Sequence, residues 1–128
     1  MKVEKAPDVQ ADVEEIVSIL QPGHINQFRL ICMRSFGAKA NAYARIWSMP
    51  KIWQAALDIS TFYVIEVLSE NFDKLSQEEK TRTLIHELMH IPKTFSGALL
   101  PHKYRGGRIG RREVEEIYRE YLKRKRVD

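Results

Sequence analysis

The first periodic pattern of apolar residues predicts a short helix over Ala11–Leu20. Apolar side chains recur there at every third or fourth position, which is the spacing of one helical face. Asp8 or Asp12 is a candidate N-cap, because a short side chain with an oxygen can accept a hydrogen bond from the first turn. Pro22-Gly23 then ends the helix.

Three later segments are rich in β-branched and aromatic residues and predict strands: His24–Phe36, Tyr43–Met49 and Phe62–Leu68. Lys51–Leu57 fits either a strand or a helix. Glu66 is the only charge in Phe62–Leu68, so we expect this strand to be partly exposed or to lie beside a site. It is either an edge strand, to which an extended peptide can add by main-chain hydrogen bonds, or a buried strand packed against the next helix.

That next helix is predicted to begin at Ser76 and to end near His90 or Ile91. Ser76 and Glu79 have the spacing of a capping box, in which each side chain satisfies the backbone N–H of the other residue. Pro92 disfavours helical geometry in the residue before it. A loop rich in Gly and Pro then spans residues 95–110, and a last amphipathic helix is predicted over Glu113–Arg126.

The order of these elements predicts an α+β fold. We expect a small twisted mixed sheet of three or four strands, with one helix packed across it and helices at both ends of the chain. The 128 residues suit a single domain, 1–128. Hydrophobic residues make up 44% and charged residues 30%, which excludes intrinsic disorder as the default state.

The composition also indicates the cellular compartment of the protein. No apolar run approaches the roughly 18 residues that a membrane span needs, and the first residues show no signal-peptide pattern. Cys32 is the single cysteine, so neither an internal disulfide nor a Cys-x-x-Cys metal site can form. We therefore expect an intracellular, cytoplasmic protein.

The net charge of +4 is concentrated in the last fifth of the chain. Residues 103–128 contain ten Lys or Arg and five Asp or Glu. A basic patch of this kind can bind nucleic acid, which leaves a nucleic-acid-associated metal-binding module as an alternative function. The competing interpretation is a solvated helix face, because the glutamates of this helix lie three or four positions from its basic residues: Glu113, Glu115, Glu116 and Glu120 beside Arg112, Arg119, Lys123 and Arg124. Only the cluster Lys123–Arg126 keeps an excess of positive charge.

The motif with the clearest chemistry is His-Glu-x-x-His at residues 86–90. Two histidines four positions apart lie about 40° from each other on a helix, so both imidazoles can bind one zinc ion. Glu87 then projects between them, where a carboxylate reaches a metal-bound water rather than the metal. Apolar residues at 84, 85, 88 and 89 occupy the opposite side of the helix.

A catalytic zinc takes three protein ligands and keeps a fourth position open. His102 is the preferred third ligand, because the Pro- and Gly-containing loop after the helix can fold back. Glu113 or Glu115 remains an alternative, since some zinc sites use two histidines and one glutamate. His24, which follows Pro22-Gly23, is interpreted as a solvated turn residue.

These segments resemble a known family. Leu84–Pro92 (LIHELMHIP), followed by Phe95–Gly97 and Pro101-His102, is similar to the putative phage metallopeptidase domain, which also occurs in archaeal and bacterial genomes. The upstream stretch Tyr63–Thr83 is similar to the segment that precedes the histidine motif in that family. The resemblance covers roughly residues 41–107.

The resemblance implies a zincin-like, zinc-dependent peptidase in a prokaryotic or phage-type context. It implies His86, His90 and His102 as ligands of one zinc ion and Glu87 as the catalytic residue, acting as general base on a metal-activated water. It names no natural substrate. A metzincin is excluded, because Ser96 stands where the third histidine of that pattern belongs.

Two alternatives stay open at this stage. SprT-like proteases, which act on DNA-bound proteins, share the general layout, although the four-cysteine zinc ribbon that some of them carry cannot form here. The chain can also be a metal-binding domain that lacks activity by itself.

Overall fold

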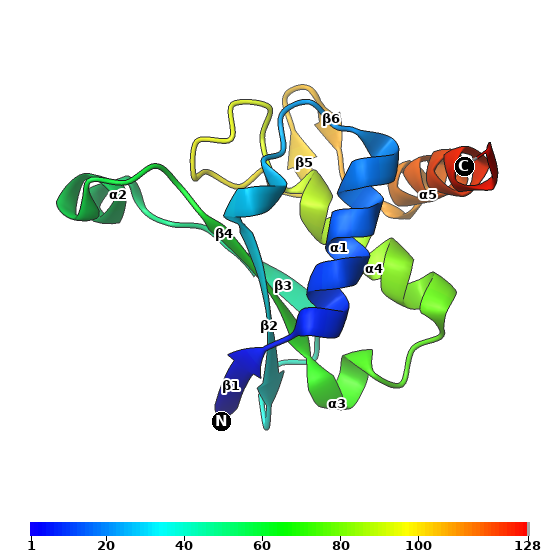
Figure 1. Ribbon diagram of the computed structural model, residues 1–128, viewed down its shortest axis with the longest axis horizontal. Coiled ribbons are helices and arrows are strands. Elements are labelled where there is room, and N and C mark those ends of the chain that lie inside the picture. Colours follow the sequence, from blue (N-terminus) through cyan, green and yellow to red (C-terminus); the bar gives the residue numbers. More distant parts are fainter. Residues whose placement is uncertain (128) are drawn as a thin grey trace.

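A four-stranded mixed sheet with helices on one face forms the fold in the computed structural model, which describes residues 1–127 (Figure 1). Along the chain the elements are β1 (Lys2–Lys5), α1 (Pro7–Leu20), the 3-10 turn η1 (Gln27–Arg29), β2 (Leu30–Phe36), β3 (Ala44–Trp47), α2 (Lys51–Leu57), β4 (Tyr63–Leu68), α3 (Ser69–Phe72), α4 (Gln77–Met89), β5 (Lys103–Tyr104), β6 (Gly107–Arg108) and α5 (Arg111–Val127). The predicted α+β class and small mixed sheet are confirmed.

The strand order is β1-β2-β4-β3, with β2 and β4 parallel and the other two pairs antiparallel. β4 is therefore an internal strand, and the hypothesis that it forms an edge is wrong. Its apolar sequence is explained by this position, because neighbouring strands cover both edges of β4 and the helix layer covers one of its faces. β3 is the edge strand on the side of α4.

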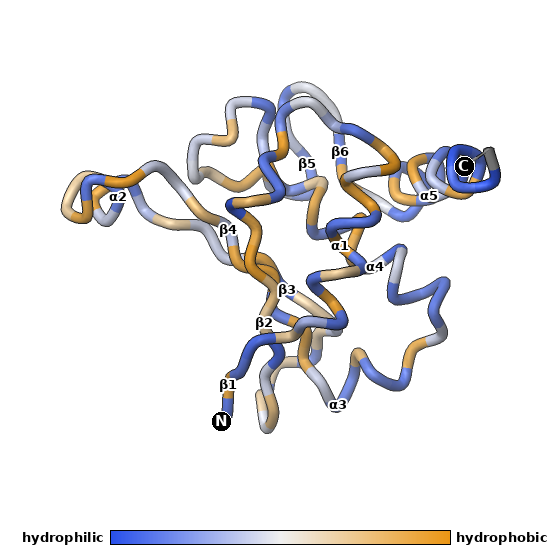
Figure 2. Tube along the Cα trace, viewed as in Figure 1, coloured by the Kyte–Doolittle hydropathy of each residue, from blue (hydrophilic) through white to orange (hydrophobic). Residues whose placement is uncertain are grey.

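The core lies between the sheet and the helices α1, α4 and α5. Alternate residues of β2 and β4 point into it, including Cys32, Tyr63 and Ile65, each at most 1% exposed. Figure 2 shows this apolar centre along the two strands, while the outer turns of α5 are hydrophilic. Burial raises the pKa of the Cys32 thiol to about 12, so this cysteine is a core residue and an unreactive one.

Several element boundaries differ from the sequence predictions. α1 begins at Pro7, four residues before the predicted start, and neither Asp8 nor Asp12 caps it; Ala6 is the N-cap and makes no side-chain capping bond. Proline suits the first helical position because its φ is already helical and no N–H is left unpaired there. The Lys-rich β1 carries no apolar alternation and was not predicted.

The remaining differences lie in short segments. The strand predicted over His24–Phe36 begins only at Leu30, because Asn26 caps the η1 turn by accepting a hydrogen bond from the Phe28 amide. Lys51–Leu57 is a helix, which decides that ambiguity. The loop over residues 95–110 contains the small β5–β6 hairpin. In the described part of the chain, no helix is long and apolar enough to cross a membrane.

Candidate metal centre

Helix α4 places two of the histidines. The predicted capping box is present: the Ser76 hydroxyl accepts from the Glu79 amide, and the Glu79 carboxylate accepts from the Ser76 amide. Leu84, Ile85 and Leu88 bury one side of the helix against the core. His86 and His90 therefore face the other side, with His90 as the C-cap residue two positions before Pro92.

The structure brings His86, His90 and His102 together. One ring nitrogen from each lies within 4.8 Å of the other two, and Nε2 of His86 is 3.1 Å from Nε2 of His102. Tetrahedral zinc with bonds of 2.0–2.1 Å separates its ligand atoms by about 3.3 Å, so the His86–His102 spacing fits that geometry closely. Among the described residues, this is the group of histidines, cysteines and carboxylates that could hold a metal ion.

The chain returns to α4 through paired main-chain contacts around Leu100. The Leu100 amide donates to the His90 carbonyl at 2.7 Å, and the Leu100 carbonyl lies 2.6 Å from Nδ1 of His90. The second contact fixes the His90 ring with Nδ1 as the donor, which leaves Nε2 free as a metal ligand. Sequence reasoning predicted the return of the loop but not this positioning by Leu100, because backbone contacts leave no residue-type signal.

A second anchor for this loop is the hydroxyl of Tyr63 in β4. It accepts a hydrogen bond from the Gly97 amide at 2.9 Å and donates one to the Ala98 carbonyl at 2.8 Å. Gly97 has φ +96°, and a Cβ there would lie 2.4 Å from Nε2 of Gln54 and 2.9 Å from the Met49 carbonyl oxygen. Only glycine meets both requirements, so the turn before His102 depends on this residue.

The electrostatics of the cluster favour the neutral form of His86. Burial, followed by the neighbouring His90 and His102, lowers the pKa of His86. A neutral ring is the form that donates a lone pair to a metal ion.

Glu87 lies between the two helix histidines and is 9% exposed. Burial raises the pKa of its carboxyl to about 7, while a backbone hydrogen bond from Ile46 in β3 acts in the opposite direction. Glu87 and the three histidines line one cavity of about 610 Å³, together with Tyr43 before β3, Arg45 in β3 and Arg111 in α5. The sequence did not assign these last residues to the site, since only the tertiary packing brings them to the cavity.

The alternative ligands lie outside this cluster. Glu113 accepts a hydrogen bond from the Gly110 amide at 2.9 Å, at the beginning of α5. Glu115 borders the cavity but pairs with Arg82 at 2.8 Å. His24 is not a freely solvated turn residue: it is half-buried, burial lowers its pKa, and it lines a different cavity.

Glu66 is neither exposed nor part of the cavity lining. It is 5% exposed, and its carboxylate accepts hydrogen bonds from Nε of Arg45 at 2.8 Å and from the Trp47 indole at 2.7 Å. Burial opposes ionisation, but these hydrogen bonds and a contact with Ser35 outweigh it and lower the pKa of Glu66. Its partner Arg45 does line the cavity, so the charge in this strand positions a cavity residue.

The basic helix α5 is largely paired with acidic groups. Arg112, Arg119 and Arg124 each lie within 4.0 Å of a glutamate three or four positions away. The positive charge of the cluster Lys123–Arg126 is partly compensated, which the sequence did not indicate, because Lys125 pairs with Glu15 of α1 at 2.8 Å. Nucleic-acid binding by this helix stays a prediction.

No curated protein and no solved structure matches this chain. The family described as Putative phage metallopeptidase matches residues 1–123 of the 128. Membership implies a metal-dependent hydrolase with a peptide or protein substrate, and the triad of histidines is a group that could bind such a metal. The chain therefore belongs to the putative phage metallopeptidase family.

Proposed function

We propose that this chain is a zinc-dependent peptidase whose single zincin-like domain binds one zinc ion through His86, His90 and His102. The observation that carries the proposal is the convergence of three imidazole nitrogens within 4.8 Å of one another, on the wall of a cavity that also contains Glu87. The donor set suits zinc because three neutral imidazoles leave one coordination position open. Cys32 is buried in the core, so the site depends on histidine alone.

A bound zinc ion would supply Lewis acidity, which lowers the pKa of a bound water and polarises the carbonyl group of the scissile bond. Glu87 accepts the proton of the attacking water and returns it to the leaving amine. Its burial between the two helix histidines, with the Ile46 amide beside it, holds the carboxyl group in one place. The Leu100 carbonyl keeps the His90 ring in the orientation that ligation requires.

The substrate would lie along β3. This strand forms the edge of the sheet next to α4, and Arg45, which pairs with Glu66 in β4, lines the same cavity as the histidines. The amide of the next residue, Ile46, points to the α4 side and meets Glu87. An extended peptide that adds to this edge by main-chain hydrogen bonds would cross the cavity in front of the histidine cluster.

The experiment measures zinc content and casein cleavage separately. Wild type is expected to bind one zinc ion per chain, by elemental analysis, and to cleave casein. Glu87→Gln should retain zinc and lose about 10²- to 10⁴-fold in rate, because the general base is removed while the ligands remain. His86→Ala and His102→Ala should lose stoichiometric zinc.

His24→Ala is the matched control, because His24 is the one histidine outside the cluster. It is expected to keep both zinc and activity. Equal cleavage by wild type and Glu87→Gln would remove Glu87 from the mechanism, and full zinc content in His102→Ala would remove the third ligand.

A further inference from the structure

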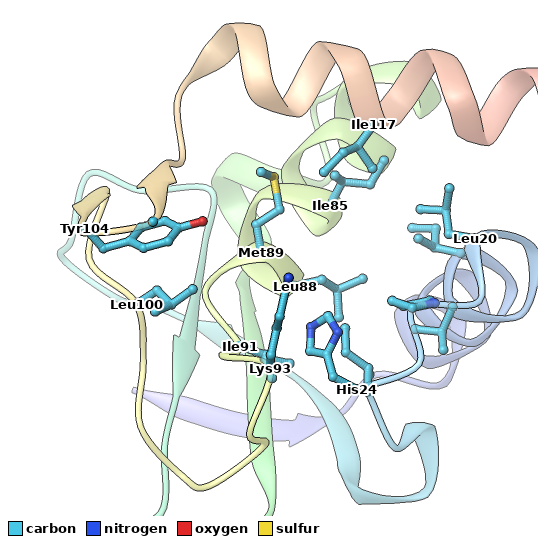
Figure 3. Close-up of a pocket in the computed structure, with 15 residues that line it drawn as sticks. Leu20, His24, Ile85, Leu88, Met89, Ile91, Lys93, Leu100, Tyr104 and Ile117 are labelled. Carbon is cyan, nitrogen blue, oxygen red and sulfur yellow. The ribbon is translucent and has the colours of Figure 1, made fainter.

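A second cavity lies on the other side of α4 from the histidine cluster. It has a volume of about 470 Å³ and is lined by residues of α1, α4 and α5, of the loop before β2 and of the segment from Ile91 to Gly106 (Figure 3). Ile85, Leu88 and Met89 of α4 line it, and Leu20 and Ile117 close it from the sides of α1 and α5. The volume falls in the range of about 300–1,000 Å³ that is typical of small-molecule sites.

The cavity has few polar groups, and none of them is acidic. Of its fifteen lining residues, only His24, Lys93 and Tyr104 carry a polar side-chain group, and no carboxylate is present. Lys93 is an exposed residue of the cavity lining, and its charge acts on the nearby His24. The Tyr104 hydroxyl points toward Met89 (Figure 3). An apolar interior with a single permanent positive charge at its rim complements an apolar body with one negative charge.

The shape of the cavity favours a small molecule over a protein partner. Its lining comes from three helices and two loops, whereas a partner helix lies in a groove that runs along one or two elements. We propose that this cavity binds a small amphiphile with a hydrocarbon body and a single carboxylate head. The body lies among the α4 and α5 side chains, and the head pairs with the Lys93 ammonium group.

The same cavity shares its walls with the segments that hold the histidine cluster. Leu88 and Met89 lie between His86 and His90 on α4. Leu100, which also lines the cavity, contacts His90 through both its amide and its carbonyl, and Tyr104 follows His102 by two residues. A bound amphiphile would therefore stabilise the loop that supplies the third histidine and strengthen metal binding, and by linkage the metal would strengthen amphiphile binding. This coupling rests on the proposed function, whereas the binding of the amphiphile does not.

The binding test is a calorimetric titration of the full, metal-free chain with dodecanoate, since carboxylates also bind zinc. One dodecanoate per chain is expected, with weaker binding of dodecanol and weaker binding still of dodecylamine. Lys93→Gln should weaken dodecanoate binding by about fivefold, the size expected of an exposed ion pair, and leave dodecanol binding unchanged. Lys74→Gln, another exposed lysine outside the cavity, is the matched control and should change neither.

Ile117→Trp fills the cavity and should abolish the binding of dodecanoate and dodecanol alike, provided that its thermal melting curve matches that of wild type. Lys93→Glu keeps the test decisive if Ile117→Trp does not fold, because an exposed charge reversal leaves the core intact and should weaken dodecanoate binding more than Lys93→Gln does. Absence of saturable dodecanoate binding would overturn the proposal. Dodecylamine binding as tightly as dodecanoate would overturn it as well, and so would an apolar helical peptide that displaces dodecanoate more effectively than dodecanol does.

The coupling is tested by chelator competition for zinc with and without dodecanoate. Tighter zinc binding in its presence is expected for wild type and not for Lys93→Glu, which controls for direct contact between dodecanoate and zinc. Unchanged zinc affinity in wild type would overturn the coupling. A chain that binds no zinc at all would contradict the proposed function, while the titration of the metal-free chain would still decide the amphiphile site.

Discussion

The histidine cluster has two halves that are held in place by different means. Helix α4 contributes His86 and His90 from a regular element with a complete capping box and a buried apolar side. The loop from Pro92 to His102 contributes the third histidine and is held by a few specific hydrogen bonds, from the Tyr63 hydroxyl and from the backbone of Leu100. The helix half therefore shares the stability of the core, while the loop half depends on single contacts.

This difference shows where assembly of the site is vulnerable. Damage to the core under α4 lowers the stability of the whole domain but leaves the two helix histidines in register as long as the chain is folded. Damage to the loop anchors leaves the domain folded and displaces one histidine of the cluster. Global stability and metal affinity should therefore respond to different substitutions.

The largest effect on stability is expected from Leu84→Ala in the helix half. Leu84 is 0% exposed in the core under α4. Its truncation should lower the free energy of unfolding by about 2–5 kcal/mol, through lost burial and the cavity left behind. Urea denaturation measures this change, and zinc affinity at low temperature should stay close to that of wild type.

Leu57→Ala is the matched control, because Leu57 on α2 is 53% exposed and its truncation should change stability by less than about 0.5 kcal/mol. A zinc affinity that falls in parallel with stability in Leu84→Ala would contradict the separation of the two halves.

Tyr63→Phe tests how the loop half is anchored. The substitution removes one hydroxyl and leaves the Gly97 amide and the Ala98 carbonyl without their partner, at a cost of about 1–3 kcal/mol in the free energy of unfolding. Because these contacts position the turn before His102, zinc affinity should fall by about 10- to 100-fold, the size expected of an outer-shell group. Chelator competition measures the affinity.

Tyr118→Phe serves as the control, since Tyr118 is also a buried tyrosine but lies in α5 and lines the edge of the core. It should leave zinc affinity unchanged. A Tyr63→Phe protein with wild-type zinc affinity would show that the loop holds His102 without this anchor.

A smaller effect is expected from Ser76→Ala at the beginning of α4. The variant loses the hydrogen bond from the Glu79 amide to the Ser76 hydroxyl, which should cost about 1 kcal/mol in the free energy of unfolding. The cap lies at the opposite end of α4 from the histidines, so zinc affinity should not change. Ser18→Ala on the exposed face of α1 is the control, and a loss there equal to that of Ser76→Ala would argue against a capping role.

The smallest effect concerns Asp73, a carboxylate that belongs neither to α4 nor to the loop. Burial opposes ionisation of Asp73, but hydrogen bonds from Arg34 and Ser69 outweigh it and lower the pKa of Asp73 from 3.8. A lowered folded pKa contributes stability that is present above the unfolded value and is lost as the pH falls through the folded value. Between about pH 4 and pH 2, wild type should therefore lose more stability than Asp73→Asn.

Chemical denaturation at several pH values measures how steeply the free energy of unfolding changes with pH. The slopes of wild type and Asp73→Asn should become equal under more acidic conditions. Asp58→Asn is the control, because Asp58 forms no ion pair among the described residues and should follow the wild-type curve. A wild-type slope equal to that of Asp73→Asn would assign the acid sensitivity to other carboxylates.

The sequence by itself determined the features that depend on local spacing. The helix with Ser76 and Glu79 at its start and the alignment of His86 and His90 on one side follow from capping chemistry and the helical period of 3.6 residues. The strand predicted over Phe62–Leu68, observed over Tyr63–Leu68, follows from its β-branched and aromatic residues. The preference for His102 over Glu113 and Glu115 came from composition and loop chemistry, and it stays a prediction. In the fold, His102 lies beside His86 and His90, whereas Glu113 accepts from the Gly110 amide and Glu115 pairs with Arg82.

Only the tertiary structure decided which strand lies at the edge, how the loop is anchored and where the cavities lie. Strand order has no signature in the sequence. The residue patterns of β3 and β4 do not show which of the two strands lies at the edge of the sheet. The anchors of the loop are a tyrosine 34 positions before Gly97 and the main chain of Leu100, and neither differs in residue type from an ordinary core or loop position. Contacts between segments far apart in the chain form only when the whole core packs, and that packing places the third histidine beside the other two.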